Sequence, residues 1–275
     1  MGKGLFGGLF SGLKRGGGIV DAMPDEPVWA IGDVHGCLDL LRRLVDHIEA
    51  QHTEQPPHVI FLGDYVDRGP HSRGVLDALV DLEGSSRIRA EFIRGNHDHV
   101  MQTFLTDSQA GPAWQGMGAD ATLASYGVPP PPLEASPEAW AEVQARFVSR
   151  VPSAHVGFLA RLRPSVQSGD YFFTHAGVRP GRPLAKQKLT DLMWVRNAFL
   201  EDRRPLEKVI VHGHTPTADP HSDHRRIGVD TGAYASGVLT GLYLEDQGRQ
   251  FVQTFRDRAA PGGLGVRTYV SPPES

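Results

Sequence analysis

Five short apolar runs in this 275-residue chain lead directly into segments that combine glycine with histidine, aspartate or asparagine. The five segments are Ile31–Gly36, Leu62–Gly69, Arg94–Asp98, Phe173–Gly177 and Val211–Thr215. If each apolar run is a strand, its polar residues stand where the strand ends. In open α/β sheets, ligands bind in the crevice beyond the carboxyl ends of the strands. The pattern therefore predicts an α/β fold with one polar site at these ends.

The first half of the chain alternates between strand and helix patterns. Strands are expected at 28–31, 58–62 and 88–93, and amphipathic helices at 38–51, 73–82 and 97–105. This alternation is typical of βαβ units in an α/β fold. Later strands are expected at 171–174, 209–211, 226–230, 238–244 and 251–255, the last three as an antiparallel run.

The remaining segments suggest one domain with an insertion and two tails. Eight glycines among residues 1–18 disfavour a helix, so 1–27 is predicted to be a disordered tail. The weaker alternative is a membrane-surface helix within 1–18. Residues 28–257 form the predicted domain, with a cap insertion at about 106–165. Residues 258–275 are rich in proline and glycine and are predicted to be a flexible tail.

Composition excludes several classes of protein. The net charge of −4 argues against binding to nucleic acid through a positive surface. A single cysteine excludes an intrachain disulfide framework and cysteine-cluster metal sites, and it fits a cytoplasmic protein. No apolar stretch is long enough to span a bilayer. The sequence does not indicate an oligomeric state.

The residue types at the strand ends are those of a catalytic metal site. Asp33 and His35 are two residues apart, so in an extended segment their side chains point the same way. Carboxylate, imidazole and amide ligands suit Mn, Fe or Zn. Two such ions about 3.5–4 Å apart can hold both oxygens of an in-line displacement at phosphorus and lower the pKa of a water.

Three of these segments together resemble a known family. Gly32–Gly36, Gly63–Gly69 and Gly95–Asp98 are similar to the signature motifs of the phosphoprotein phosphatase (PPP) family of binuclear metallophosphatases, in its bacterial and phage-type serine/threonine branch. The resemblance covers about residues 28–245. It implies a four-layer α-β-β-α sandwich of two mixed sheets with a small cap insertion. Trp114 and Thr122–Gly127 resemble a further segment of bacterial members, and we expect this region to line the substrate groove.

The resemblance also implies a role for each motif residue. Two divalent metal ions, most simply Mn with Fe, Zn or Ni as alternatives, would be held by Asp33, His35, Asp64, Asn96, His175 and His214. Asp64 would bridge the two ions. His97 would be the general acid, with its imidazole oriented by Asp67. Arg68 and Arg196 would bind the phosphate oxygens of the substrate.

The implied activity is that of a phosphomonoesterase, in which a metal-bridging hydroxide attacks phosphorus in line. The substrate would be a phosphoprotein or a phosphorylated small molecule, and a protein serine/threonine phosphatase is the first hypothesis. A related branch hydrolyses symmetric bis(5'-nucleosyl)-tetraphosphates and usually has alanine where Asp67 stands, so Asp67 favours the phosphatase. An inactive metal-binding scaffold is the third hypothesis, and the complete ligand set argues against it.

Overall fold

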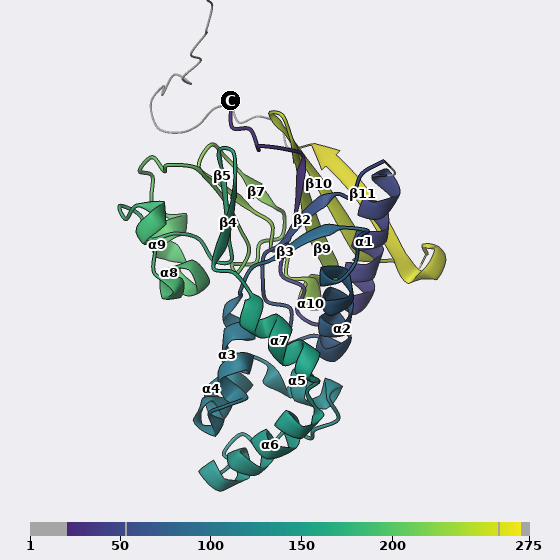
Figure 1. Cartoon of the computed structure of the whole chain (residues 1–275), viewed down its shortest axis with the longest axis vertical. Helices are drawn as coiled ribbons and strands as arrows, with labels where there is room; N and C mark the ends of the chain where they lie inside the picture. The colour runs from purple at the N-terminus through teal and green to yellow at the C-terminus, as the bar shows by residue number, and fades with distance from the viewer. Residues whose placement is uncertain (1–20, 53, 258, 271–275) are drawn as a thin grey trace, which may run out of the picture.

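The computed structural model describes residues 21–52, 54–257 and 259–270, and its core is two mixed β-sheets (Figure 1). The six-stranded sheet has the order β11-β10-β9-β1-β2-β3, and the five-stranded sheet has the order β4-β5-β6-β8-β7. The first sheet contains β1 (Val28–Ile31), β2 (His58–Phe61), β3 (Arg89–Phe92), β9 (Val238–Glu245), β10 (Gly248–Arg256) and β11 (Leu264–Val270). The second contains β4 (Ser165–Ser168), β5 (Tyr171–Thr174), β6 (Val209–His212), β7 (His221–Ser222) and β8 (Arg226–Gly228).

Each sheet combines parallel and antiparallel pairs. In the first, β2 is parallel to β1 and β3, whereas β9 is antiparallel to β1 and β10. In the second, β6 is parallel to β5 and β8, whereas β4 and β7 are antiparallel to their neighbours. The predicted α/β class with two mixed sheets is confirmed.

Helices lie outside the two sheets and in an insertion (Figure 1). The outer helices are α1 (Leu38–Gln51), α2 (Ser72–Glu83), α3 (Asn96–Phe104), α8 (Leu189–Trp194) and α9 (Asn197–Leu200). The insertion contains η1 (Ser108–Ala110), α4 (Gly111–Gln115), α5 (Ala119–Ser125), α6 (Pro137–Arg150) and α7 (Ser153–Arg161). Short helical turns are η2 (Leu184–Lys186), α10 (Ala233–Ser236) and η3 (Pro261–Gly263). In the described part of the chain, no helix has the length and apolar character needed to cross a membrane.

Three apolar clusters separate four layers. Trp29 and Ile31 of β1 pack toward α1 and α2, while Val28 and Ala30 point into the space between the sheets. Ile210 of β6 belongs to a third cluster, with side chains of α8 and α9. Because side chains alternate along a strand, one strand contributes to two clusters. This alternation gives the layer order helices, sheet, sheet, helices.

The insertion is held to the rest of the chain by buried aromatic and polar contacts. Phe104 of α3 packs against Trp114 and Trp140 at ring-centroid distances of 5.0 and 5.7 Å. Tyr126 donates its hydroxyl hydrogen bond to His155 Nδ1 at 2.7 Å, which places the end of α5 against α7. These contacts fix the position of α4 and α5 beside α3, which matters for the site described below.

The prediction of a flexible tail over 258–275 is wrong for residues 264–270, which form a strand. β11 pairs with β10 from Leu264 opposite Arg256 to Val270 opposite Gln250. Proline and glycine around 261–263 hide this strand in the sequence, because they form a tight turn before it rather than a frayed end.

The tail predicted over 1–27 also needs correction at its end. The backbone N–H groups of Met23 and Asp25 donate to Asp170 and Ser168 at 3.1 and 3.0 Å, and Ala22 is buried. Residues 21–27 therefore pack against the β4–β5 hairpin. Residues 1–20, with the alternative of a membrane-surface helix in 1–18, lie outside the described residues.

The expected antiparallel run of the last three strands is wrong in one respect. β9 and β10 form an antiparallel pair, but β8 lies in the other sheet, parallel to β6. The chain changes sheet through α10, which is flanked by Gly232 and Gly237, with φ of 64° and 70°. Positive φ at both glycines allows the sharp turns that this crossing requires.

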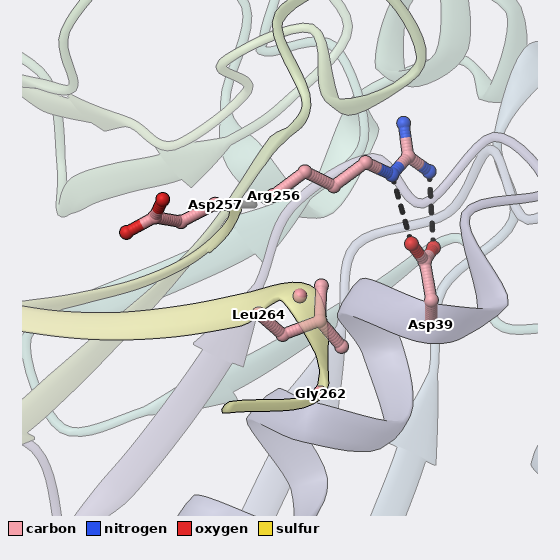
Figure 2. A pocket seen from close by; sticks show the side chains of 6 residues that line it. Asp39, Arg256, Asp257, Gly262 and Leu264 are labelled. Carbon is pink, nitrogen blue, oxygen red and sulfur yellow. Dashed lines mark hydrogen bonds and ion pairs between the residues drawn. The ribbon is translucent and has the colours of Figure 1, made fainter. Parts of the chain in front are cut away.

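The start of α1 meets the end of β10 at a surface cavity (Figure 2). The cavity is lined by Asp39, Arg256, Asp257, Gly262, Gly263 and Leu264. Two hydrogen bonds of 2.8 and 3.0 Å join the Arg256 guanidinium to the Asp39 carboxylate. None of the predicted site residues lines this cavity, so it connects the first helix to the β10–β11 hairpin without belonging to the site.

The single cysteine is expected to be chemically inert in the native protein. Cys37 is fully buried, and burial raises the pKa of its thiol, so little of the reactive thiolate forms near neutral pH. Alkylation by iodoacetamide is expected to be at least about 100-fold slower than in the same protein unfolded in guanidinium. The incorporated label can be counted by mass spectrometry. Rapid labelling of the native protein would contradict the buried position.

Candidate metal centre

Asp64 lies at the centre of the converging strand ends. Its Oδ2 atom is 3.4 Å from His175 Nε2, 3.6 Å from His35 Nε2 and 3.8 Å from His97 Nε2. Asp64 follows β2, His35 follows β1 and His175 follows β5, so the two sheets supply one cluster. All four side chains are buried. The polar residues that follow these strands therefore lie at one place, as the sequence pattern predicts.

Two groups in this cluster have the composition and spacing of a metal site. One contains His35, Asp64 and His97, and the other contains Asp64, His175 and His214. In the second group, His175 Nε2 lies 3.2 Å from His214 Nδ1 and 2.9 Å from Asn96 Oδ1. Asp64 belongs to both groups. This is the position that a carboxylate bridging two cations would occupy.

Asp33 lies beside the cluster but in neither group. Its two carboxylate oxygens accept the backbone N–H of His214 at 3.2 and 3.0 Å. Burial and the neighbouring Asp230 raise the pKa of Asp33 well above its ordinary value. Asp230 itself accepts the backbone N–H of Gly232 at 2.8 Å. Asp230 follows β8 and lies close enough to Asp33 to affect its charge.

Hydrogen bonds from the far side of two rings fix their orientation. His35 Nδ1 donates to the Val66 carbonyl at 2.8 Å, and His175 Nδ1 donates to the Leu62 carbonyl at 2.9 Å. Each ring therefore turns its Nε2 atom toward Asp64. Backbone partners of this kind hold a metal-ligating imidazole in one tautomer and one orientation.

The electrostatics of the cluster fit divalent cations. Five buried carboxylates lie in this region: Asp33, Asp64, Asp67, Asp98 and Asp230. Burial opposes ionisation of Asp64, but the imidazoles of His175, His97 and His35 outweigh it and hold its pKa well below the ordinary value. Such a concentration of buried negative charge is costly unless positive charge compensates it.

The histidines respond to this field in two ways. Burial opposes a charge on His175, but Asp64 outweighs it and raises the pKa of His175 to about 10. Burial lowers the pKa of His35 to about 3 and that of His214 to about 2, so both rings are neutral. Neutral imidazole is the form that binds a metal. His35 and His214 are already in this form, whereas His175 would release its extra proton to a bound cation, and with that exchange the donor set fits two cations.

His97 and Asp67 form a second buried pair next to the cluster. His97 Nδ1 donates to Asp67 Oδ2 at 2.7 Å. Burial works against protonation of His97, but Asp64 and Asp67 outweigh it and raise the pKa of the ring. His97 Nε2 faces Asp64 Oδ2 at 3.8 Å and the Arg68 guanidinium at 3.3 Å.

The insertion supplies the other partners of Asp67. Trp114 Nε1 donates to Asp67 Oδ2 at 2.9 Å, and Thr122 Oγ1 donates to Asp67 Oδ1 at 2.6 Å. Both Trp114 and Thr122 are fully buried. The expectation that these two residues line a substrate groove is therefore wrong. They hold a carboxylate that in turn holds His97.

Asp98 is a buried residue of the third motif whose role the sequence did not reveal. Its carboxylate accepts the backbone N–H groups of Gly95, Asp64 and Tyr65 at 2.8–3.0 Å. Burial and the nearby Asp64 raise the pKa of Asp98 to about 7. Its position in the first turn of α3 was the available signal. Asp98 joins the loops that follow β2 and β3, which carry Asp64 and His97.

The two predicted arginines lie on opposite flanks of the cluster. An amino group of Arg68 is 3.3 Å from His97 Nε2. Arg196 donates to the His214 carbonyl at 3.2 Å and contacts Thr215 Oγ1 at 3.4 Å. The Arg68 guanidinium thus lies next to His97, and the Arg196 guanidinium lies next to His214.

The backbone is strained at the same residues. Six non-glycine residues of the described part have φ between 42° and 73°. Five of them are predicted site residues, namely His35, Asp64, Asp67, Arg68 and His214. Left-handed conformations of this kind cost about 1–3 kcal/mol each and persist where the surroundings fix them, typically at functional sites.

Neighbouring glycines let the strained loops touch. Gly36 has φ of 64°, and a Cβ atom there would lie 2.5 Å from the Gly69 carbonyl oxygen. A Cβ atom on Gly95 would overlap the Asp64 carboxylate. The glycines of the motifs therefore permit the close approach that brings the side chains of three loops together.

Comparison with known proteins agrees with this geometry. A sequence profile described as calcineurin-like phosphoesterase matches residues 26–237. The asymmetrical bis(5'-nucleosyl)-tetraphosphatase PrpE of Halalkalibacterium halodurans is 27% identical over 232 residues, covering 77% of this chain and 87% of the relative. PrpE of Bacillus cereus is 26% identical over 237 residues, covering 77% of this chain and 88% of the relative.

Solved structures share the fold at lower identity. A provisionally assigned diadenosine tetraphosphatase has a TM-score of 0.55 at 17% identity, covering 91% of this chain and 98% of that chain. A mutant of a cold-active protein tyrosine phosphatase has a TM-score of 0.53 at 16% identity, covering 90% and 83%. These likenesses concern the fold, whereas the profile covers most of the sequence. The chain belongs to the calcineurin-like phosphoesterase family.

Proposed function

We propose that this chain is a metal-dependent phosphatase in which His97 protonates the leaving oxygen of a phosphoric ester. The observation that carries the proposal is the position of the His97–Asp67 pair, which lies directly beside the Asp64 cluster. An inactive metal-binding scaffold would have no use for a buried, carboxylate-oriented imidazole at this place.

Each predicted residue has a place in the proposed reaction. Asp33, His35, Asp64, Asn96, His175 and His214 would hold two divalent cations, with Mn as the first choice. When bound, these cations would neutralise charge on the phosphoryl oxygens and lower the pKa of a water that attacks phosphorus. Arg68 and Arg196 would bind the remaining phosphoryl oxygens from the two flanks.

His97 would give its Nε2 proton to the leaving oxygen. Asp67 keeps the other nitrogen, Nδ1, protonated and fixes the plane of the ring. Trp114 and Thr122 hold Asp67 in turn, so the ring cannot rotate without breaking buried hydrogen bonds. A general acid held in this way reduces the cost of proton transfer to a poor leaving group.

Two substrate classes have specific support. Asp67 in the second motif favours a protein serine/threonine phosphatase of the PPP type. The identity to PrpE proteins favours a bis(5'-nucleosyl)-tetraphosphate. We also propose the cytoplasm as the compartment, because the one cysteine has no second thiol to pair with.

A substrate panel tests the proposal. Purified protein would be treated with a chelator, reloaded with Mn²⁺, Ni²⁺ or Mg²⁺, and assayed on p-nitrophenyl phosphate, phosphoserine and phosphotyrosine peptides, and diadenosine tetraphosphate. We expect turnover that disappears with the chelator and returns with Mn²⁺. Absence of turnover on every substrate with Mn²⁺ bound would overturn the proposal and support the scaffold.

Trp114→Phe is expected to lower kcat for a phosphoserine peptide about tenfold without unfolding the protein. The change keeps an aromatic ring in the core but removes the Nε1 hydrogen bond to Asp67, and support of this kind is worth roughly 10–100-fold. Trp140→Phe is the matched control, because Trp140 is equally buried in the insertion and its Nε1 has no hydrogen-bond partner among the described residues. Equal kcat for the two variants would contradict the role of Trp114.

A further inference from the structure

One flank of the cluster carries an exposed aromatic ring against an arginine and a buried histidine. Tyr234 of α10 is 37% exposed. The Arg68 guanidinium lies over its ring at 4.7 Å from the centroid, and the His35 ring meets it edge-on at 5.3 Å. Tyr234 therefore borders the His35 side of the centre, with part of its surface open to solvent.

The opposite flank repeats the arrangement with other residues. Trp194, the last residue of α8, is 43% exposed, and its ring lies 6.4 Å from the His214 ring in an edge-on orientation. Arg196, two residues further on, donates to the His214 carbonyl. Each flank thus has one arginine, one half-exposed aromatic ring and one buried histidine of the cluster.

Packing does not account for these two rings. The chain has four tryptophans, and the other three, Trp29, Trp114 and Trp140, are almost fully buried. Ligand sites combine aromatic side chains with a few convergent polar or charged groups, and each flank has this composition. Aromatic side chains stack on nucleobases with about 1–3 kcal/mol per base, without requiring a particular base.

We propose that Tyr234 and Trp194 are stacking sites for the two bases of a dinucleoside polyphosphate, whose phosphate chain crosses between Arg68 and Arg196. This inference rests on the proposed function and selects the second of its substrate classes. A substrate with an aromatic group at each end and negative charge between them matches an arginine and an aromatic ring on each flank. A phosphoserine side chain has no ring and would leave both aromatic surfaces unused.

The kinetic test compares two substrates in the same variants. Tyr234→Leu and Trp194→Leu are each expected to lower the ratio of kcat/KM for diadenosine tetraphosphate to kcat/KM for a phosphoserine peptide by about 5- to 100-fold. Tyr234→Phe and Trp194→Phe keep a stacking surface, so in both variants this ratio is expected to stay close to the wild-type value. Tyr269→Leu removes an equally exposed tyrosine from β11 and should leave the ratio unchanged.

A binding test gives an independent measurement. Trp194 is the exposed tryptophan, so diadenosine tetraphosphate is expected to quench part of the intrinsic fluorescence. Trp194→Phe should abolish the quenching that comes from Trp194. Tyr234→Leu should keep this quenching but shift it to higher concentrations of diadenosine tetraphosphate, because binding is weaker. The chelated protein can be used, so that no turnover occurs during the titration.

The outcomes separate this inference from the proposed function. Wild-type protein that hydrolyses no substrate contradicts the proposed function itself. Wild-type protein that hydrolyses only the phosphopeptide leaves the function standing and overturns the stacking sites. Leucine variants that lose both activities equally, or neither, also overturn the stacking sites, because the rings would then serve only to position the arginines or would have no role. Thermal melting of each variant verifies that it is folded.

Discussion

Asp64→Asn is expected to reduce Mn²⁺-dependent hydrolysis of p-nitrophenyl phosphate by ~1000-fold or more. Asp64 is the one carboxylate shared by both candidate metal groups, with three imidazole nitrogens within 3.8 Å of the same oxygen. The amide has almost the same shape but no charge, so it would weaken both cation sites at once. Isothermal titration with Mn²⁺ is expected to show weaker binding of Mn²⁺ in this variant, and the hydrolysis assay is expected to show the loss of turnover.

A surface carboxylate provides the control for this change. Asp46→Asn alters an exposed residue of α1 and should change neither the binding of Mn²⁺ nor turnover. Full binding of two Mn²⁺ ions with normal turnover in Asp64→Asn would remove Asp64 from the centre of the proposed mechanism. Circular dichroism would verify that the asparagine variant keeps its secondary structure.

His97→Asn should produce a loss that depends on the leaving group. A general acid contributes about 10²–10⁴-fold when the leaving oxygen is a strong base. We therefore expect kcat for a phosphoserine peptide to fall by ~100-fold or more, since serine leaves as an alkoxide. For p-nitrophenyl phosphate, whose leaving group is stable without a proton, the expected fall is within about threefold.

The contrast between the two substrates is the informative quantity for His97. An equal loss on both would mean that the residue acts as a metal ligand, because it also lies in the group with His35 and Asp64. Asp67→Asn should also lower kcat more for the phosphoserine peptide than for p-nitrophenyl phosphate, but by a smaller factor than His97→Asn. The change leaves the imidazole in place but removes the charge that favours its protonated form.

Local sequence patterns predicted the strands and ligands well because both are local properties. β1 begins and ends where the apolar run does, and α1 occupies the whole of its amphipathic pattern. His35, Asp64 and Asn96 follow their strands within a few residues, so strand order alone brings them to one edge.

Contacts between distant segments could not be read in the same way. Trp114 and Thr122 reach Asp67 across 47 and 55 residues, and nothing in their own neighbourhood marks them as partners of a carboxylate. β8 directly precedes β9 among the strands, yet it joins the other sheet because α10 turns the chain between them. The pairing of β11 depends on a partner strand and not on its own composition.

The left-handed backbone at five site residues lowers the stability of the folded protein, while the side chains at these positions serve the proposed reaction. Glycine would relieve the conformational cost at Arg68, yet it would remove the side chain on which the proposed chemistry depends. Selection for folding stability and selection for turnover therefore favour different residues at such a position. A descendant that no longer needs turnover could accept glycine at position 68, where no buried hydrogen bond among the described residues depends on the side chain, and would gain thermal stability as it lost activity.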